Sequence, residues 1–324
     1  MTEIYEHPPS GQTLLPALHA FLPHSLPLTA RLSHPTPTPH SHILATFPPS
    51  SPPPQCWAAA YLDRSHRPET ESWIFVSGSA PGRCAGFAAA ETVHEKAEGE
   101  KEKPRDVCPA CAEALMELVA YMTGLPLPPV EARPARTGRY FPPEGREPLL
   151  IGSLAEGPAR VLDGRGWVAR DLPGLEEGYW KYIFQPQEGE GEAALPAGLR
   201  MESPVRRQDL KTVLERTEVP RGEGTMAGLE SVGVYEGEQL VGWGFVGLDG
   251  SVTSLGVEEE WRRRGIAKAI VRWVVGRAAG LGGGYAHADV GMGNGGSNAV
   301  CVKAGGRRGG VVYWVRIEIP SPYE

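Results

Sequence analysis

The sequence predicts an α/β protein, and three observations support this prediction. Strand-like runs at 228–236, 239–248 and 251–257 are separated by Glu-Gly-Glu and Asp-Gly, which suit the tight turns of antiparallel hairpins. Apolar residues recur at helical spacing in 108–124 and again in 264–278. Further short strand-like runs follow each of these helical segments, and such alternation is typical of a sheet covered by helices.

Composition limits the classes of function. A chain of 324 residues with 41% hydrophobic and 22% charged residues is long enough for two globular domains. Its formal net charge of −7 offers no overall attraction to nucleic acid. The chain starts with acidic residues and prolines where an export signal needs basic and apolar ones, and its apolar runs are shorter than the roughly 20 residues of a membrane helix. We therefore expect a cytoplasmic protein without a membrane or nucleic-acid partner, and the sequence makes no prediction about its oligomeric state.

The first 54 residues contain 13 of the 32 prolines and predict a partly ordered segment, with a short helix at 14–22 and a strand at 42–47. The rest of the first half predicts a hairpin of two strands at 56–63 and 72–78, a solvated charged loop at 94–106 and a helix at 108–124. It then predicts a strand at 149–154, a short helix at 155–162 and two further strands at 166–171 and 179–185.

An acidic, Gly-rich stretch without aromatic residues, at 187–198, is the best candidate for a linker. The chain is therefore expected to divide into the Pro/His-rich segment 1–54, an α/β domain at 55–186, the linker 187–198 and a second domain at 199–324.

The second half predicts a helix over 203–220, three strands, a helix, a strand at 285–290, a short helix at 297–306 and a last strand at 311–319. The first half follows a similar order, so it is a candidate for a degenerate copy of the same fold. The alternative is that many α/β domains share such an order without being related.

The turn between strand 251–257 and helix 264–278 has the properties of an anion site. The free N–H groups of a helix N-terminus and the positive end of its dipole can bind a pyrophosphate. Small residues keep side chains away from the backbone here, and arginines can add charge-assisted hydrogen bonds. The residues concerned are Arg262, Arg263, Arg264, Gly265, Ile266 and Ala267.

At this turn the sequence resembles the GNAT superfamily of N-acetyltransferases, whose acyl-coenzyme A signature is Gln/Arg-x-x-Gly-x-Gly/Ala between a strand and a helix. A second GNAT motif, Asn-x-x-Ser followed by Lys-x-Gly, comes one helix and one strand later. The residues that match the two motifs are Arg262, Gly265, Ala267, Asn294, Ser297, Lys303 and Gly305.

Two departures from the family pattern point to a subgroup. Cys301 stands where many GNAT enzymes have a tyrosine that reprotonates the leaving thiolate, and Gly306 stands where an aromatic residue is usual. Fungal FR47-like proteins related to glycine N-acyltransferase resemble this chain in both features and in Trp314. The resemblance implies an α+β fold with a mixed, mostly antiparallel sheet flanked by helices. It also implies acetyl-CoA or another acyl-CoA as cosubstrate, and direct attack of a neutral amine on the thioester.

The resemblance also assigns roles near the cosubstrate. Leu255 and Val257 are expected to contact the pantetheine through their backbone, with an N–H donor near Val257 for the carbonyl oxygen. The ammonium form of an amine must lose a proton before attack, so Glu258, His287 and Asp289 are candidate bases. The alternatives are a solvated acidic turn at Glu258 and a structural pair at His287 and Asp289.

Cys301 is a candidate acid, because an ordinary thiol pKa of about 8.5 suits protonation of a thiolate. The alternative is a small buried apolar side chain. Cys108-Pro-Ala-Cys111 has the spacing of half a zinc site, but Cys56 and Cys84 are isolated in the sequence, so no metal is expected.

Two classes of function follow. The first is an N-acyltransferase that moves an acetyl or short acyl group to a primary amine of a small molecule or amino acid, with a protein N-acetyltransferase as a variant. The second is an acyl-CoA-binding regulatory module without turnover. Amine-dependent release of free coenzyme A thiol distinguishes the two classes.

Overall fold

Both halves of the chain contain the same succession of elements. The computed structural model describes residues 2–34, 38–69, 72–82, 107–129, 140–143, 145–186, 195–217, 219 and 221–320. The first half contains β1 (Tyr5–Glu6), α1 (Leu15–His19), α2 (Leu26–Ser33), β2 (His42–Ala45), β3 (Ala58–Leu62), β4 (Ser72–Val76), the 3-10 turn η1 (Ser77–Ser79), α3 (Pro109–Gly124), β5 (Leu149–Ala155), α4 (Glu156–Gly164) and β6 (Tyr179–Phe184).

The second half contains β7 (Leu199–Glu202), η2 (Arg207–Asp209), α5 (Leu210–Glu215), α6 (Glu223–Gly228), β8 (Ser231–Glu236), β9 (Gln239–Val246), β10 (Val252–Val257), η3 (Glu259–Trp261), α7 (Ile266–Ala278), β11 (Ala286–Gly291), α8 (Gly295–Lys303) and β12 (Arg307–Ile317). Apart from the 3-10 turns, each half therefore follows the order β-α-α-β-β-β-α-β-α-β. The predicted mixed, mostly antiparallel fold is confirmed, and so is its repeat in the first half.

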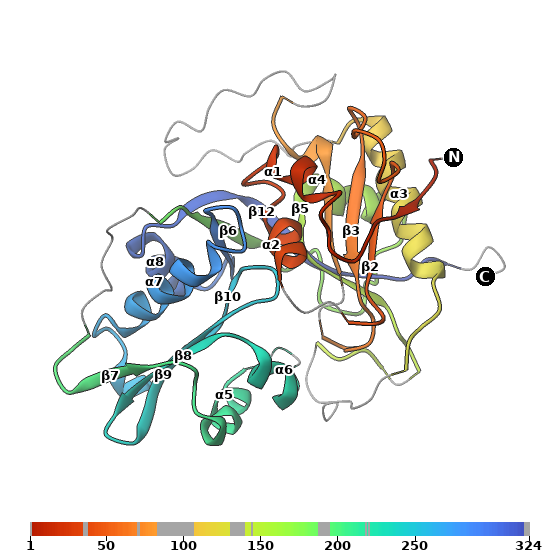
Figure 1. Cartoon of the computed structure of the whole chain (residues 1–324). Helices are drawn as coiled ribbons and strands as arrows, with labels where there is room; N and C mark the ends of the chain where they lie inside the picture. Colours follow the sequence, from red (N-terminus) through yellow and green to blue (C-terminus); the bar gives the residue numbers. More distant parts are fainter. Residues whose placement is uncertain are drawn as a thin grey trace.

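The two halves exchange their last strands. An eight-stranded sheet has the order β1-β2-β3-β4-β5-β12-β6-β11, and a four-stranded sheet has the order β10-β9-β8-β7. Thus β12, from the end of the chain, lies between β5 and β6, while β6, from the first half, pairs along its whole length with β11 (Figure 1). Because each half supplies a strand to the other, the sheet of either half is incomplete alone.

Two parts of the expected domain division can be compared with this fold. The segment 1–54 is part of the first half, because β1 and β2 pair in the main sheet and Leu14, Leu18 and Leu28 pack under the aromatic side chains of that half. The first half therefore begins at β1 rather than at residue 55. The charged loop at 94–106 and residues 187–194 of the expected linker lie outside the described residues, so the linker stays a prediction.

Two predicted elements differ from the structure. The segment 166–171 forms a single bridge, Val168 to Ile317, because β6 occupies the same edge of β12 as far as Val312. The helix expected over 203–220 begins only at Arg207, since Arg206 has an extended backbone, and α5 ends at Glu215. The helix α2 and the strand β7 were not predicted.

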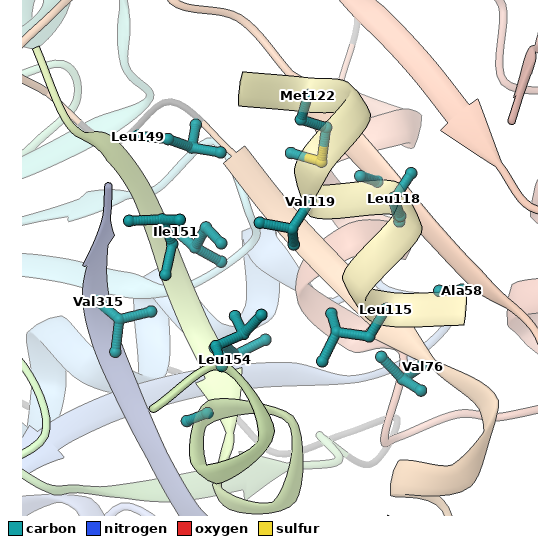
Figure 2. Close-up of a cluster of buried hydrophobic side chains, with 14 of the residues drawn as sticks. Ala58, Val76, Leu115, Leu118, Val119, Met122, Leu149, Ile151, Leu154 and Val315 are labelled. Carbon is teal, nitrogen blue, oxygen red and sulfur yellow. The ribbon is translucent and has the colours of Figure 1, made fainter. Parts of the chain in front are cut away.

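The core of the first half holds α3 against the sheet. Figure 2 shows Leu115 and Val119 of α3 on the side toward Ile151 of β5 and, beyond it, Val315 of the exchanged strand β12, while Leu118 lies on the other side of α3 in the same core. All five side chains are fully buried. The end of the chain thus contributes to the core of the beginning, as the strand exchange requires.

Truncation of Leu118 is expected to lower the free energy of unfolding by roughly 2–5 kcal/mol, since Leu118→Ala removes buried contacts and leaves a cavity. Leu127→Ala is the matched control, because this leucine is 45% exposed. Denaturant unfolding of the two variants measures the difference. Equal losses of stability in both would contradict the described core.

Among the described residues, no helix combines the length and the apolar composition needed to cross a lipid bilayer.

Candidate functional site

The strands β10 and β11 lie at the edges of two different sheets. They touch through one isolated parallel bridge, between Ser251 and His287, while β10 pairs along its other edge with β9. All six residues of β10 are half-buried, whereas the neighbouring strands β8 and β9 are almost wholly buried. The edge of β10 that faces β11 is therefore available to a ligand beyond the bridge.

A β-bulge shapes β10. The pairing with β9 shifts register between Thr253 and Gly256, and Ser254 has a positive φ of 49°. After the bulge, the N–H of Glu258 donates to the carbonyl of Val241 on β9. Since N–H groups alternate in direction along a strand, that of Val257 points away from β9, toward the open edge. The N–H of Val257 thus points toward the open edge, and its contact with a cosubstrate stays a prediction.

The chain then turns into α7 through two residues with positive φ, Arg263 at 62° and Gly265 at 88°. Glycine adopts this conformation without strain. The first helical bond from this end runs from the N–H of Ala269 to the carbonyl of Gly265, at 3.1 Å. The N–H groups of Ile266, Ala267 and Lys268 lie in the first turn and have no carbonyl one turn earlier within the helix. These N–H groups lie at the positive end of the helix dipole, and their binding of an anion stays a prediction.

The predicted arginines surround this turn and are exposed. Arg262 donates from Nε to the carbonyl of Val257 at 3.2 Å, which links the end of β10 to the turn. The guanidinium of Arg264 lies over the ring of Trp261, 4.6 Å from its centroid. Ile266 is fully buried and fixes the start of α7 against β9, whereas Ala267 is half-buried.

The second motif forms the start of α8. Asn294 is its N-cap residue, and the side-chain oxygen accepts a hydrogen bond from the N–H of Ser297 at 3.0 Å. The neighbouring Asn298 is buried and accepts from the Tyr182 hydroxyl at 2.9 Å. Asn294 therefore has a capping function in the fold, and contact of Asn294 and Ser297 with a cosubstrate stays a prediction.

Cys301 lies in the hydrophobic core between α7, α8 and the sheet. Its side chain is buried, and burial raises the pKa of the thiol to about 12. Such a thiol stays protonated and lies among apolar side chains, which is the environment of the apolar alternative.

A buried polar cluster adjoins the bridge between β10 and β11, and it contains two of the predicted residues. The Lys181 ammonium of β6 donates to Asp289 Oδ1 at 2.8 Å, to His287 Nδ1 at 3.2 Å and to Ser153 Oγ at 2.6 Å. His287 Nε2 lies 3.0 Å from the carbonyl of Asp249. Because a carbonyl can only accept, Nε2 carries a hydrogen, while Nδ1 lies between Lys181 Nζ at 3.2 Å and Asp289 Oδ1 at 3.4 Å.

Asp289 is ionised in this cluster. Burial opposes its charge, but the Lys181 ammonium outweighs burial and holds the pKa of Asp289 well below its ordinary value. The Asp289 side chain is 4% exposed, and its second oxygen, Oδ2, has no hydrogen-bond partner among the described residues. This oxygen is itself buried, so the charge of Asp289 is balanced by Lys181 and is not open to solvent.

Sequence reasoning missed Lys181 and Asp249. Lys181 is the one charged residue of a strand that otherwise reads YWYIF, and a lysine inside such an apolar strand is a signal for a buried partner. Asp249 was interpreted as a turn residue, whereas its carboxylate accepts from Trp73 Nε1 at 3.0 Å and from Ser251 Oγ at 2.6 Å. The contact with Trp73 joins the two halves.

Glu258 lies at the end of β10 and is half-buried, with its carboxylate 3.4 Å from Arg216 Nε. Its side chain alternates with that of Val257, which packs toward α7, so Glu258 faces the opposite side of the sheet. His287 and Asp289 face that side too, because Ala286 and Ala288 pack toward α7. The three candidate bases thus point away from α7, Glu258 from the end of β10 and His287 and Asp289 from β11.

The low pKa of Asp289 predicts a dependence of stability on pH. Its carboxylate binds a proton at a higher pH in the unfolded chain than in the folded one, so its contribution is present above the ordinary pKa and decreases as the pH falls below it. Between about pH 5 and pH 3, the wild type is expected to lose more stability than Asp289→Asn. Denaturant unfolding at both pH values measures this, with exposed Glu260→Gln as control. Equal losses in wild type and Asp289→Asn would contradict the ion pair.

Comparison with known families shows to which family the chain belongs. The family described as the acyl-CoA N-acyltransferase verG N-terminal domain matches residues 1–182, more than half of the chain. The chain belongs to this acyltransferase family. The acetyltransferase (GNAT) family matches residues 202–305, which contain the β10 bulge and the α7 turn. The predicted membership of the GNAT superfamily is confirmed.

Solved structures are similar to this GNAT acyltransferase, and the first of the three below shows the same fold. A Drosophila melanogaster protein is similar with a TM-score of 0.61 at 12% identity, over 97% of this chain and 98% of that chain. A GCN5-related N-acetyltransferase from Sphaerobacter thermophilus has a TM-score of 0.49 at 13% identity, over 98% and 95% of the two chains. A tandem GNAT protein from the clavulanic acid biosynthesis pathway has a TM-score of 0.46 at 13% identity, over 98% and 99%. The comparison with curated proteins gives no match.

Proposed function

We propose that the protein transfers an acetyl or short acyl group from acyl-CoA to a primary amine of a small molecule or amino acid. The observation that carries this proposal is the geometry of β10, whose Val257 N–H points toward the open edge beside the N-terminus of α7. The pyrophosphate binds the N–H groups at 263–268, and the pantetheine follows the backbone of Leu255 and Val257. The thioester carbonyl then accepts from the Val257 N–H, where negative charge develops during attack.

The acceptor amine approaches from the opposite face of the sheet, where Glu258, His287 and Asp289 lie. Because the pKa of Asp289 is low, its carboxylate holds a cation better than it removes a proton. We therefore assign Asp289 to the ion pair with Lys181 rather than to proton removal, and His287 to positioning these two groups.

Transfer is a direct displacement within a complex of both substrates. Proton loss to Glu258, directly or through water, produces the neutral amine, which forms the new C–N bond as the C–S bond breaks. The second proton of the attacking nitrogen neutralises the departing thiolate. This route uses no thiol of the protein, in agreement with the buried position of Cys301 and its raised pKa.

The test is the release of free coenzyme A thiol from acetyl-CoA over a panel of small amines, amino acids and peptides, with mass spectrometry of the product. We expect thiol release that depends on a small amine and an amide product in equal amount. Release with peptides alone would replace the small-molecule acceptor with a protein N-terminus or lysine. Tight acetyl-CoA binding without amine-dependent release would overturn the enzyme and leave a binding module.

A further inference from the structure

Three cysteine thiols meet at the N-terminus of α3, in the half of the chain that the proposed reaction does not use. Cys56 directly precedes Trp57 and β3, Cys108 is the N-cap residue of α3, and Cys111 lies in the first turn of that helix. Their sulfur atoms all lie within 4.8 Å of one another, and the sulfurs of Cys56 and Cys108 are 3.6 Å apart. The fold thus joins two cysteines at the spacing Cys-x-x-Cys to a third that is 52 residues from Cys108 in the chain.

The distances suit a shared metal ion rather than a disulfide. A disulfide needs sulfur atoms about 2.05 Å apart. Two thiolates bound tetrahedrally to one Zn²⁺, at about 2.3 Å each, lie roughly 3.8 Å from each other. The 3.6 Å between the sulfurs of Cys56 and Cys108 is close to the second value. The sulfur of Cys111 lies within 4.8 Å of both and becomes a third ligand by moving inward.

The cluster lies at the start of α3, where the positive end of the helix dipole is found. The Ser77 hydroxyl lies 3.4 Å from the sulfur of Cys111 and accepts from the N–H of Trp57 at 3.0 Å, so it connects two of the three cysteine positions. Cys111 is fully buried, whereas Cys56 and Cys108 are half-buried, which leaves the cluster a side toward solvent.

We propose that Cys56, Cys108 and Cys111 bind one Zn²⁺ ion as a structural site. Three thiols lose their protons to solvent as three Zn–S bonds form, and thiolate is the ligand type that selects zinc over magnesium or calcium. A further ligand outside this trio completes the tetrahedron. The ion connects the segment before β3 to the start of α3. The helix α3 contributes Leu115 and Leu118 to the core of the first half. This site corrects the expectation that Cys56 is isolated, which considered distance along the chain alone.

The test is the zinc content of the untagged full chain, purified under reducing conditions and measured by elemental mass spectrometry. We expect about one Zn²⁺ per wild-type chain. Each of Cys56→Ser, Cys108→Ser and Cys111→Ser is expected to lower the zinc content at least tenfold. The control is Cys301→Ser, which changes a buried cysteine in the other half and keeps the zinc.

If a serine variant does not fold, two experiments on the wild type alone test the zinc site. Removal of zinc with a strong chelator is expected to lower its Tm, and added Zn²⁺ to restore it. X-ray absorption of the zinc-loaded chain is expected to show at least three sulfur neighbours at about 2.3 Å. Three results would overturn the site: no zinc bound or taken up by the wild type, zinc that all three serine variants retain, or a Cys56–Cys108 disulfide that persists under reducing conditions.

Discussion

Lys181→Met is expected to lower the free energy of unfolding by roughly 3–5 kcal/mol, because it leaves Asp289 charged, buried and without its cationic partner. Methionine keeps much of the volume of the lysine stem, so the lost charge accounts for most of the effect. Lys181 comes from the first half and Asp289 from the second. The same variant is therefore expected to weaken the pairing of β6 with β11 and to reduce acyl transfer. Denaturant unfolding and thiol release measure the two consequences.

The control is Lys211→Met, which breaks an exposed ion pair with Glu215 and is expected to change little. The double variant Lys181→Met with Asp289→Asn removes both charges and is expected to recover part of the lost stability, since no buried charge is left unpaired. An additive loss in the double variant would contradict the buried ion pair.

Ala267→Glu is expected to weaken acetyl-CoA binding on the order of 100-fold, about 2.7 kcal/mol. The new carboxylate lies in the first turn of α7, where it occupies the anion site and repels the pyrophosphate. A glutamate near a helix N-terminus does not destabilise the helix itself. The folded structure, followed by circular dichroism and Tm, is therefore expected to remain, while the Kd from calorimetry rises.

Ala120→Glu, on the exposed side of α3, is the matched control, because it adds the same charge far from the site. It is expected to leave the Kd unchanged. An equal loss of affinity in both variants would show that the effect comes from net charge. Unchanged binding in Ala267→Glu would contradict pyrophosphate binding at the start of α7.

Local patterns in the sequence were sufficient to predict the turn before α7. Gly265 follows a strand and precedes an amphipathic helix, and the structure confirms both elements and the positive φ that makes glycine suitable there. The hairpin of β3 and β4 was likewise predicted from two aromatic-rich runs. In each of these cases the interacting residues are close in sequence, so periodicity and turn residues contain the information.

Contacts between distant segments were not predictable in this way. The exchange of β6 and β12 pairs residues that are more than a hundred positions apart. The sequence of either strand alone does not indicate which strand it pairs with. The same holds for Lys181 with Asp289 and for Cys56 with Cys108, which the fold brings together from separate elements. Asn294 is a further example, because its motif predicts contact with the cosubstrate, while the structure also gives it the capping bond at the start of α8.

The measurement that tests the account most directly is amide hydrogen exchange of the full chain with and without acetyl-CoA. Binding as described predicts slower exchange at Leu255 and Val257 and in the segment 263–268, because these N–H groups become hydrogen-bonded to the cosubstrate. Exchange in α3, in the other half, is expected to change little. Protection confined to the first half, or no protection in β10 and α7, would contradict the site.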